Sequence, residues 1–162
     1  MQILRQFNGA LLTLAGWIAM AALAAIAILV PYEVFGRYVI GKMSTWTNEF
    51  CQYAVVWATM MGGAVALKRG MHVGITSLTD CLPTSLCRWV QAIGYVCVLV
   101  FLSLMTYYGF AQTIMNMNQT SSTVGISMSI PYAALPIGFF IMLCITVEQL
   151  ADFLTAGPAG RK

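Results

Sequence analysis

No Asp, Glu, Lys or Arg occurs in the whole stretch between Arg88 and Glu148. A helix needs about 20 mainly apolar residues to cross the hydrocarbon core of a bilayer, so this stretch can cross it twice. Across the chain, hydrophobic residues make up 60% and charged residues 8%, whereas soluble domains carry about 25% charged residues. Such a chain cannot cover its surface with polar groups. We therefore expect an all-α integral membrane protein that forms a single membrane domain, residues 1–162.

The apolar runs predict four transmembrane helices and one short interfacial segment. The helices are expected at about residues 10–38, 46–67, 88–115 and 131–154, and the interfacial segment at about 71–83. The interfacial segment is too short and too polar to span, but it can place an apolar side against the membrane surface. The first run is longer than the apolar core of a signal peptide, which has about 7–15 residues. We therefore expect a retained helix, with a cleaved signal as the alternative.

Lys and Arg are distributed unequally between the two sides of the membrane. With the N-terminus inside, the inner segments carry six basic residues, namely Arg5, Lys68, Arg69, Arg88, Arg161 and Lys162. The outer segments carry only Arg37 and Lys42. The positive-inside rule then predicts that both termini are cytoplasmic and that the uncharged loop at residues 116–129 faces outward. Because the basic residues lie at the ends of apolar runs, the net charge of +3 does not indicate nucleic-acid binding.

Polar groups are scarce near the middle of the predicted helices, where a protein that moves polar solutes needs them. Only Thr13 and Ser103 lie at that depth in the first and third helices. The acidic residues lie near helix ends, where we expect solvation or ion pairing; they include Glu33, Glu49, Glu148 and Asp152. No nucleophile elbow or phosphate loop is present, and one histidine with scattered cysteines does not suggest a metal or haem site. The sequence thus predicts no catalytic, substrate-binding or metal-binding residues.

Small residues recur at every fourth position of the second predicted helix. They are Ala54, Ala58, Gly62 and Ala66. This spacing places them on one helix face, and in membranes small residues let helix backbones approach closely. We therefore predict close packing on this face.

Charged and aromatic residues mark the turn between the first two helices. Arg37 ends one helix and Glu49 begins the next on the same side, so we predict that they pair across the turn. Tyr38 and Trp46 are placed to anchor at the same membrane interface. Arg69 and His72 mark the opposite interface, where lipid phosphates or a partner can meet them.

Five short motifs follow one another along the chain. They are Phe-x-Arg-Tyr ending at Tyr38, Trp-x-x-Glu ending at Glu49, the single Trp57, a basic-Gly-x-His turn from Arg69 to His72, and a helix that opens with Pro131 and continues into Leu-Pro-Ile-Gly around Pro136. Together they resemble the small membrane subunit of tripartite ATP-independent periplasmic (TRAP) transporters, the DctQ/SiaQ type. Asn48 and Thr76 stand where that family often has acidic residues.

The resemblance implies a scaffold subunit in a bacterial inner membrane. In such systems a large permease subunit carries the substrate and sodium sites, and a periplasmic substrate-binding protein captures a carboxylate such as a C4-dicarboxylate or a sialic acid. The small subunit would pack against the large one through small residues such as Ala58 and Gly62 and help to dock the binding protein. The resemblance therefore implies no cofactor on this chain, because sodium would bind to the large subunit. Lipid bound to this chain is compatible with the resemblance.

Three other classes of membrane protein also have a comparable size. A small homo-oligomeric multidrug-type exporter needs an acid embedded in its first helix, and this chain has none before Glu33. A membrane-anchor subunit of a redox complex would need paired histidines or a quinone site. A membrane protein with an unrelated assembly role is the third alternative.

Overall fold

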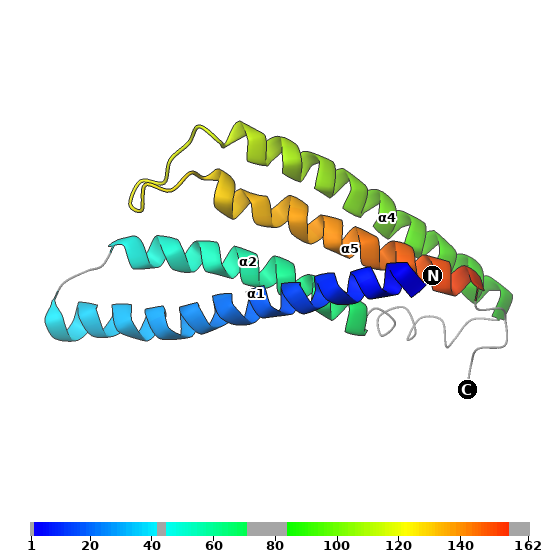
Figure 1. Cartoon of the computed structure of the whole chain (residues 1–162), viewed down its shortest axis with the longest axis horizontal. Helices are drawn as coiled ribbons and strands as arrows, with labels where there is room; N and C mark the ends of the chain where they lie inside the picture. Colours follow the sequence, from blue (N-terminus) through cyan, green and yellow to red (C-terminus); the bar gives the residue numbers. More distant parts are fainter. Residues whose placement is uncertain (1, 42–44, 71–83, 156–162) are drawn as a thin grey trace.

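The computed structural model describes residues 2–41, 45–70 and 84–155 and contains four long helices in that part of the chain (Figure 1). The first, α1 (Gln2–Phe35), continues into a π-helical segment, η1 (Gly36–Ile40). The others are α2 (Thr45–Gly70), α4 (Thr84–Met115) and α5 (Ser129–Thr155). All four are long and apolar enough to cross a membrane, which confirms the predicted fold class. The expected interfacial segment at 71–83, with His72, lies outside the described residues.

The helices form two antiparallel hairpins that pack side by side. Helix α1 packs on α2, α4 packs on α5, and the two hairpins meet through α2 and α5. Figure 1 shows the resulting order α1, α2, α5, α4 across the molecule. We call the end where α1 begins and α5 ends the terminal end. The opposite end, where residues 116–128 join α4 to α5, is called the loop end.

Helix α1 is longer than the sequence predicted. The 34 residues of α1 and the five of η1 together measure about 58 Å, at 1.5 Å per residue, against about 30 Å for the hydrocarbon core. The helix must therefore tilt or extend past the apolar layer. It begins at Gln2 instead of near residue 10 because its first polar turns pack against α5. It ends at Gly41, whose left-handed backbone (φ 70°) lets its N–H bond to the carbonyl of Gly36.

The interior of the bundle is built mainly from small and aliphatic side chains. Its buried apolar cluster draws on α1, α2 and α5 and consists of Ala15, Ala19, Met61, Ala64, Ile141 and Ile145. Many large apolar side chains, such as Trp17 and Trp89, are instead exposed on the outer faces. In lipid such exposure carries no hydrophobic penalty, so close packing and interhelical hydrogen bonds must hold the helices together.

Glycines set the closest helix approaches. A Cβ built on Gly138 of α5 would lie 2.8 Å from Cβ of Met60 on α2, and one on Gly63 would lie 2.9 Å from Cε of Met142. A Cβ on Gly109 of α4 would lie 3.2 Å from the backbone nitrogen of Pro136. The α2–α5 and α4–α5 contacts therefore both depend on the absence of a side chain.

Candidate functional site

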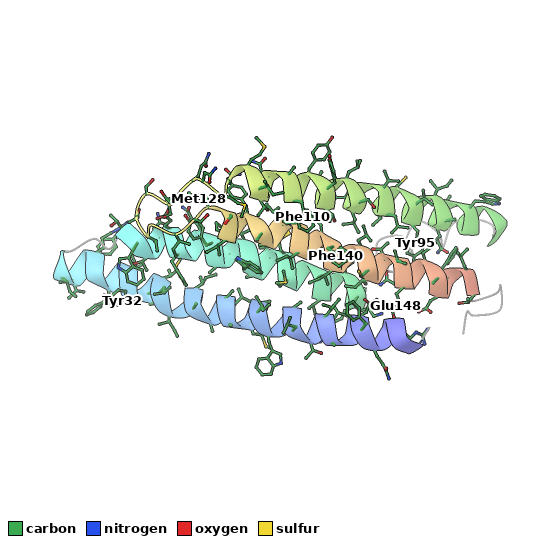
Figure 2. The ribbon with its side chains drawn as sticks, turned by 45° about the horizontal axis from the view of Figure 1, so that its top comes forward. Tyr32, Tyr95, Phe110, Met128, Phe140 and Glu148 are labelled. Atoms are coloured by element: carbon green, nitrogen blue, oxygen red, sulfur yellow. The ribbon has the colours of Figure 1, made fainter. Side chains whose placement is uncertain are left out.

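A buried carboxylate joins three helices at the terminal end. Glu148 on α5 is only 3% exposed. Its Oε1 accepts a hydrogen bond from Nζ of Lys68 on α2 (2.8 Å), and its Oε2 accepts one from Nδ2 of Asn8 on α1 (2.7 Å). The same Asn8 amide also lies 3.2 Å from the carbonyl of Cys144. Figure 2 shows Glu148 beside the first turns of α1.

A second ion pair lies beside this carboxylate. Arg5 contacts Asp152 at 2.6 Å and reaches to 4.0 Å from Glu148. We call Arg5, Asn8, Lys68, Glu148 and Asp152 the terminal cluster. Because a buried charge is costly unless it is paired and hydrogen-bonded, the cluster holds α1, α2 and α5 in one arrangement.

The sequence prediction described the terminal cluster only in part. Ion pairing was expected for acidic residues near helix ends, and Glu148 and Asp152 confirm it. The burial of Glu148 and the role of Asn8 were missed. The available signal was the position of Asn8, a polar residue directly before the first apolar run, on the same predicted side of the membrane as Lys68 and Glu148.

A second polar cluster ties α2 to the loop at residues 116–128. Tyr53 donates its hydroxyl hydrogen to Oε1 of Glu49 (2.7 Å) and lies 3.5 Å from Sδ of Met128. The backbone N–H of Thr123 donates to Oε2 of Glu49 (3.2 Å). We call Glu49, Tyr53, Thr123 and Met128 the loop cluster. Met128 is labelled at this end in Figure 2.

The connecting loop itself is folded. The N–H of Ser121 bonds to the carbonyl of Ile126, and the N–H of Met128 bonds to the carbonyl of Gln119, both at 2.8 Å. Gly125 adopts a left-handed conformation (φ 71°) at the turn between them. With Glu49 attached at its tip, this uncharged loop presents a defined surface at the loop end.

The predicted pair between Arg37 and Glu49 is wrong. Arg37 instead contacts Glu33, one helical turn earlier, at 3.3 Å. Residues four apart on a helix are neighbours, so Glu33 is reached without crossing the turn. Both oxygens of Glu49 are already engaged by Tyr53 and the loop.

The predicted aromatic and proline positions take different environments. Tyr38 is 80% exposed and Trp46 is 46% exposed, both at the loop end, and their role as interfacial anchors remains a prediction. Trp57 is half-buried and packs against the core of the bundle. Pro131 and Pro136 are buried in α5, and Pro136 forms the surface on which Gly109 rests.

The small-residue face of α2 divides into two parts. Ala58 is buried within this chain, at 7% exposure, so its predicted place at the large-subunit surface is wrong. A spacing of four residues advances about 40° more than a full turn, so the row rotates away from any fixed neighbour. Gly62 has therefore left the buried face, and a Cβ there would meet no atom within 4 Å.

No set of metal-binding side chains converges in the described part of the chain. Among residues 2–41, 45–70 and 84–155, no three His, Cys, Asp or Glu side chains come together in a way that would hold a metal ion. The polar groups serve instead to join helices at the two ends of the bundle.

The known proteins that this chain resembles are all components of one class of transporter. Residues 26–156 match the DctQ family, described as tripartite ATP-independent periplasmic transporters, DctQ component. The chain is 25% identical to the sialic acid TRAP transporter small permease protein SiaQ of Vibrio cholerae, covering 85% of this chain and 79% of that protein. It is 29% identical to the C4-dicarboxylate small permease protein DctQ of Rhodobacter capsulatus, over 65% of this chain and 47% of that protein. It is also 26% identical to the sialic acid permease protein SiaT of Haemophilus influenzae, over 86% of this chain but 23% of that protein.

Proposed function

Because this chain belongs to the DctQ family of tripartite ATP-independent periplasmic transporter components, we propose that it is the scaffold subunit of a sodium-coupled importer of carboxylates. Family membership makes it a multi-pass inner-membrane transport component and not an enzyme. Small permease subunits of this family work with a large permease subunit. The proposal adds the role of this chain, the coupling ion and the class of substrate.

The observation that carries the scaffold role is the distribution of buried polar side chains. Asn8, Thr146 and Glu148 lie toward the terminal end, and Thr47, Asn116 and Ser121 lie at the loop end. Within the described part of the chain, the buried residues between them are apolar or glycine. A path for a charged solute needs polar groups near the bilayer midplane, so this distribution supports substrate and sodium sites on the large subunit.

The loop end supplies the proposed docking surface for a periplasmic substrate-binding protein. With the loop end facing the periplasm, both termini are cytoplasmic. This agrees with the six basic residues that the sequence analysis assigns to the cytoplasmic side. Glu49 and Tyr53 fix the 116–128 loop to α2. A loop held in one conformation loses less entropy on binding a partner than a free one, which favours docking at this surface.

The class of substrate rests on the names of the relatives. Several of them are named for sialic acid or for C4-dicarboxylates, which carry carboxylates, and one is named for isethionate, a sulfonate. We propose a carboxylate for this transporter too, recognised by the binding protein and the large subunit.

A pull-down followed by transport assays tests the proposal. The chain is tagged in its host, extracted in mild detergent, and its co-purifying proteins are identified by mass spectrometry. Recovery of a large permease, then uptake in vesicles that requires a sodium gradient and the binding protein, would agree with the scaffold role. A chain that purifies alone and still transports a solute would refute it and favour the small-exporter alternative.

A further inference from the structure

An open groove of about 450 Å³ runs between α1 and α2 from the terminal end. Lys68 and Arg69 stand at its head, while Trp17 and Met20 line its deeper part. Gly9 and Gly16 form the α1 wall, and a Cβ on either would meet no atom within 4 Å. The groove is therefore open space that the packing of this chain leaves unfilled.

The dimensions of the groove fit one leaflet of a bilayer. From Gly9 to Met20 the α1 wall extends about 17 Å along the helix axis, close to half of the roughly 30 Å hydrocarbon core. The hydroxyl of Thr13 in this wall already has a hydrogen-bond partner, because it donates to the carbonyl of Gly9 at 2.9 Å. The groove thus offers an apolar channel of one-leaflet depth.

The terminal cluster balances only part of the charge at the head of the groove. Lys68 is paired with Glu148, and Arg5 is paired with Asp152. Arg69 is exposed and makes no hydrogen bond or ion pair with any residue that the structure describes. The guanidinium of Arg69, with the remaining N–H groups of Lys68 beside it, therefore has no partner among the described residues above the apolar channel.

We propose that this groove binds an anionic phospholipid of the leaflet at the terminal end, with its phosphate on Arg69 and Lys68 and one acyl chain along Gly9, Gly16, Trp17 and Met20. Basic pockets between transmembrane helices suit anionic headgroups, and Arg engages phosphate oxygens with two parallel hydrogen bonds. A free phosphate would use only the head of the groove and leave the apolar channel empty. The site depends on the membrane location of the chain and not on the substrate of the transporter.

The test counts bound lipid in the tagged complex, with all co-purifying subunits retained. The complex is placed in nanodiscs of equal phosphatidylethanolamine and phosphatidylglycerol, released, and examined by native mass spectrometry. We expect wild-type complex to retain phosphatidylglycerol and Arg69→Gln to retain about fivefold less. Gly16→Phe keeps the charge but fills the channel, so it should also lose the lipid. Arg37→Gln and Ala27→Phe change charge and bulk outside the groove and should behave as wild type.

Each outcome decides the assignment. Retention of phosphatidylglycerol by both groove variants would overturn the site. Loss in Arg69→Gln with full retention in Gly16→Phe would place the lipid outside the channel and also overturn it. Displacement of the bound lipid by excess inorganic phosphate would assign the head of the groove to a free anion instead. If Arg69→Gln does not assemble, the Gly16→Phe measurement and its Ala27→Phe control still decide.

Discussion

At the residue scale, Glu148 is the acceptor on which three helices converge. It receives hydrogen bonds from Lys68 of α2 and Asn8 of α1, and it is almost completely buried. Lys68 is different, because its side chain is 34% exposed and can extend toward the membrane surface. Removing the charge of Lys68 should therefore change the stability of the chain by a different amount from removing the charge of Glu148.

We predict that Lys68→Met destabilises the chain more than Glu148→Gln. The first change leaves a buried carboxylate without its cation, a loss on the order of 1–3 kcal/mol or more. The second leaves a lysine that can reach water and keeps a hydrogen-bond acceptor for Asn8. The thermal unfolding midpoints of the two variants in detergent measure the loss of stability in each. The double variant should be more stable than Lys68→Met alone; a double variant that is worse than either single change would show that the pair is not the source of the effect.

A second prediction at this scale concerns Arg37 and Glu49. These residues have separate partners, Glu33 for Arg37 and the loop cluster for Glu49. Alanine at each position should therefore lower the thermal midpoint independently, and the double variant should show the sum of the two shifts. A double variant that loses clearly less than the sum would reinstate a direct pair.

At the element scale, the sequence predicted the helices well and their contacts poorly. Charge-free apolar runs decide where helices cross lipid, so the four spans and the intervening loop followed from composition. The start of α1 was missed, because the residues before position 10 look like a polar lead, whereas Arg5 and Asn8 contact α5 and support additional helical turns. The close-packing positions of Gly109 and Gly138 were also missed, since no period in the sequence shows which face of a helix meets Met60 or Pro136.

The third prediction separates two glycines by their surroundings. Gly138→Ala would bring a Cβ to 2.8 Å from Cβ of Met60, an atom fixed to the α2 backbone. The α2–α5 contact must then open, which typically costs about 1–3 kcal/mol. Gly62→Ala is the matched control, because its Cβ would enter open space. Thermal unfolding in detergent should show a lower midpoint for Gly138→Ala and an unchanged or slightly higher one for Gly62→Ala. Equal midpoints would argue against the close approach.

At the scale of the whole molecule, the fourth prediction concerns orientation. We expect the loop at residues 116–128 to face the periplasm and the end of α5 to face the cytoplasm. In a variant without native cysteines, Ser122→Cys should react with a membrane-impermeant maleimide in intact spheroplasts. Thr155→Cys, at the other end of the bundle and also exposed, should react only after lysis. The reverse labelling pattern would invert the topology and move the proposed docking surface to the cytoplasm.

The exposed face of α2 leads to the last prediction, which concerns assembly. Val55, Thr59 and Ala66 lie exposed on this helix, and Gly62 lies among them with open space above it. A face of small and short side chains is suited to close approach by a helix of the large subunit. Because a Cβ on Gly62 would meet no described atom within 4 Å, a larger side chain there should spare the fold and act on the partner.

Gly62→Leu should therefore leave the thermal midpoint of the isolated chain nearly unchanged while reducing the amount of large permease recovered with it. Ala27→Leu places the same leucine side chain at an exposed position of α1 and serves as the control for an added bulky residue. Recovery is measured by quantitative mass spectrometry of the tagged complex. If Gly62→Leu and Ala27→Leu recover the large subunit equally, this face of α2 is turned to lipid, and the small subunit must meet its partner through α1 or α4.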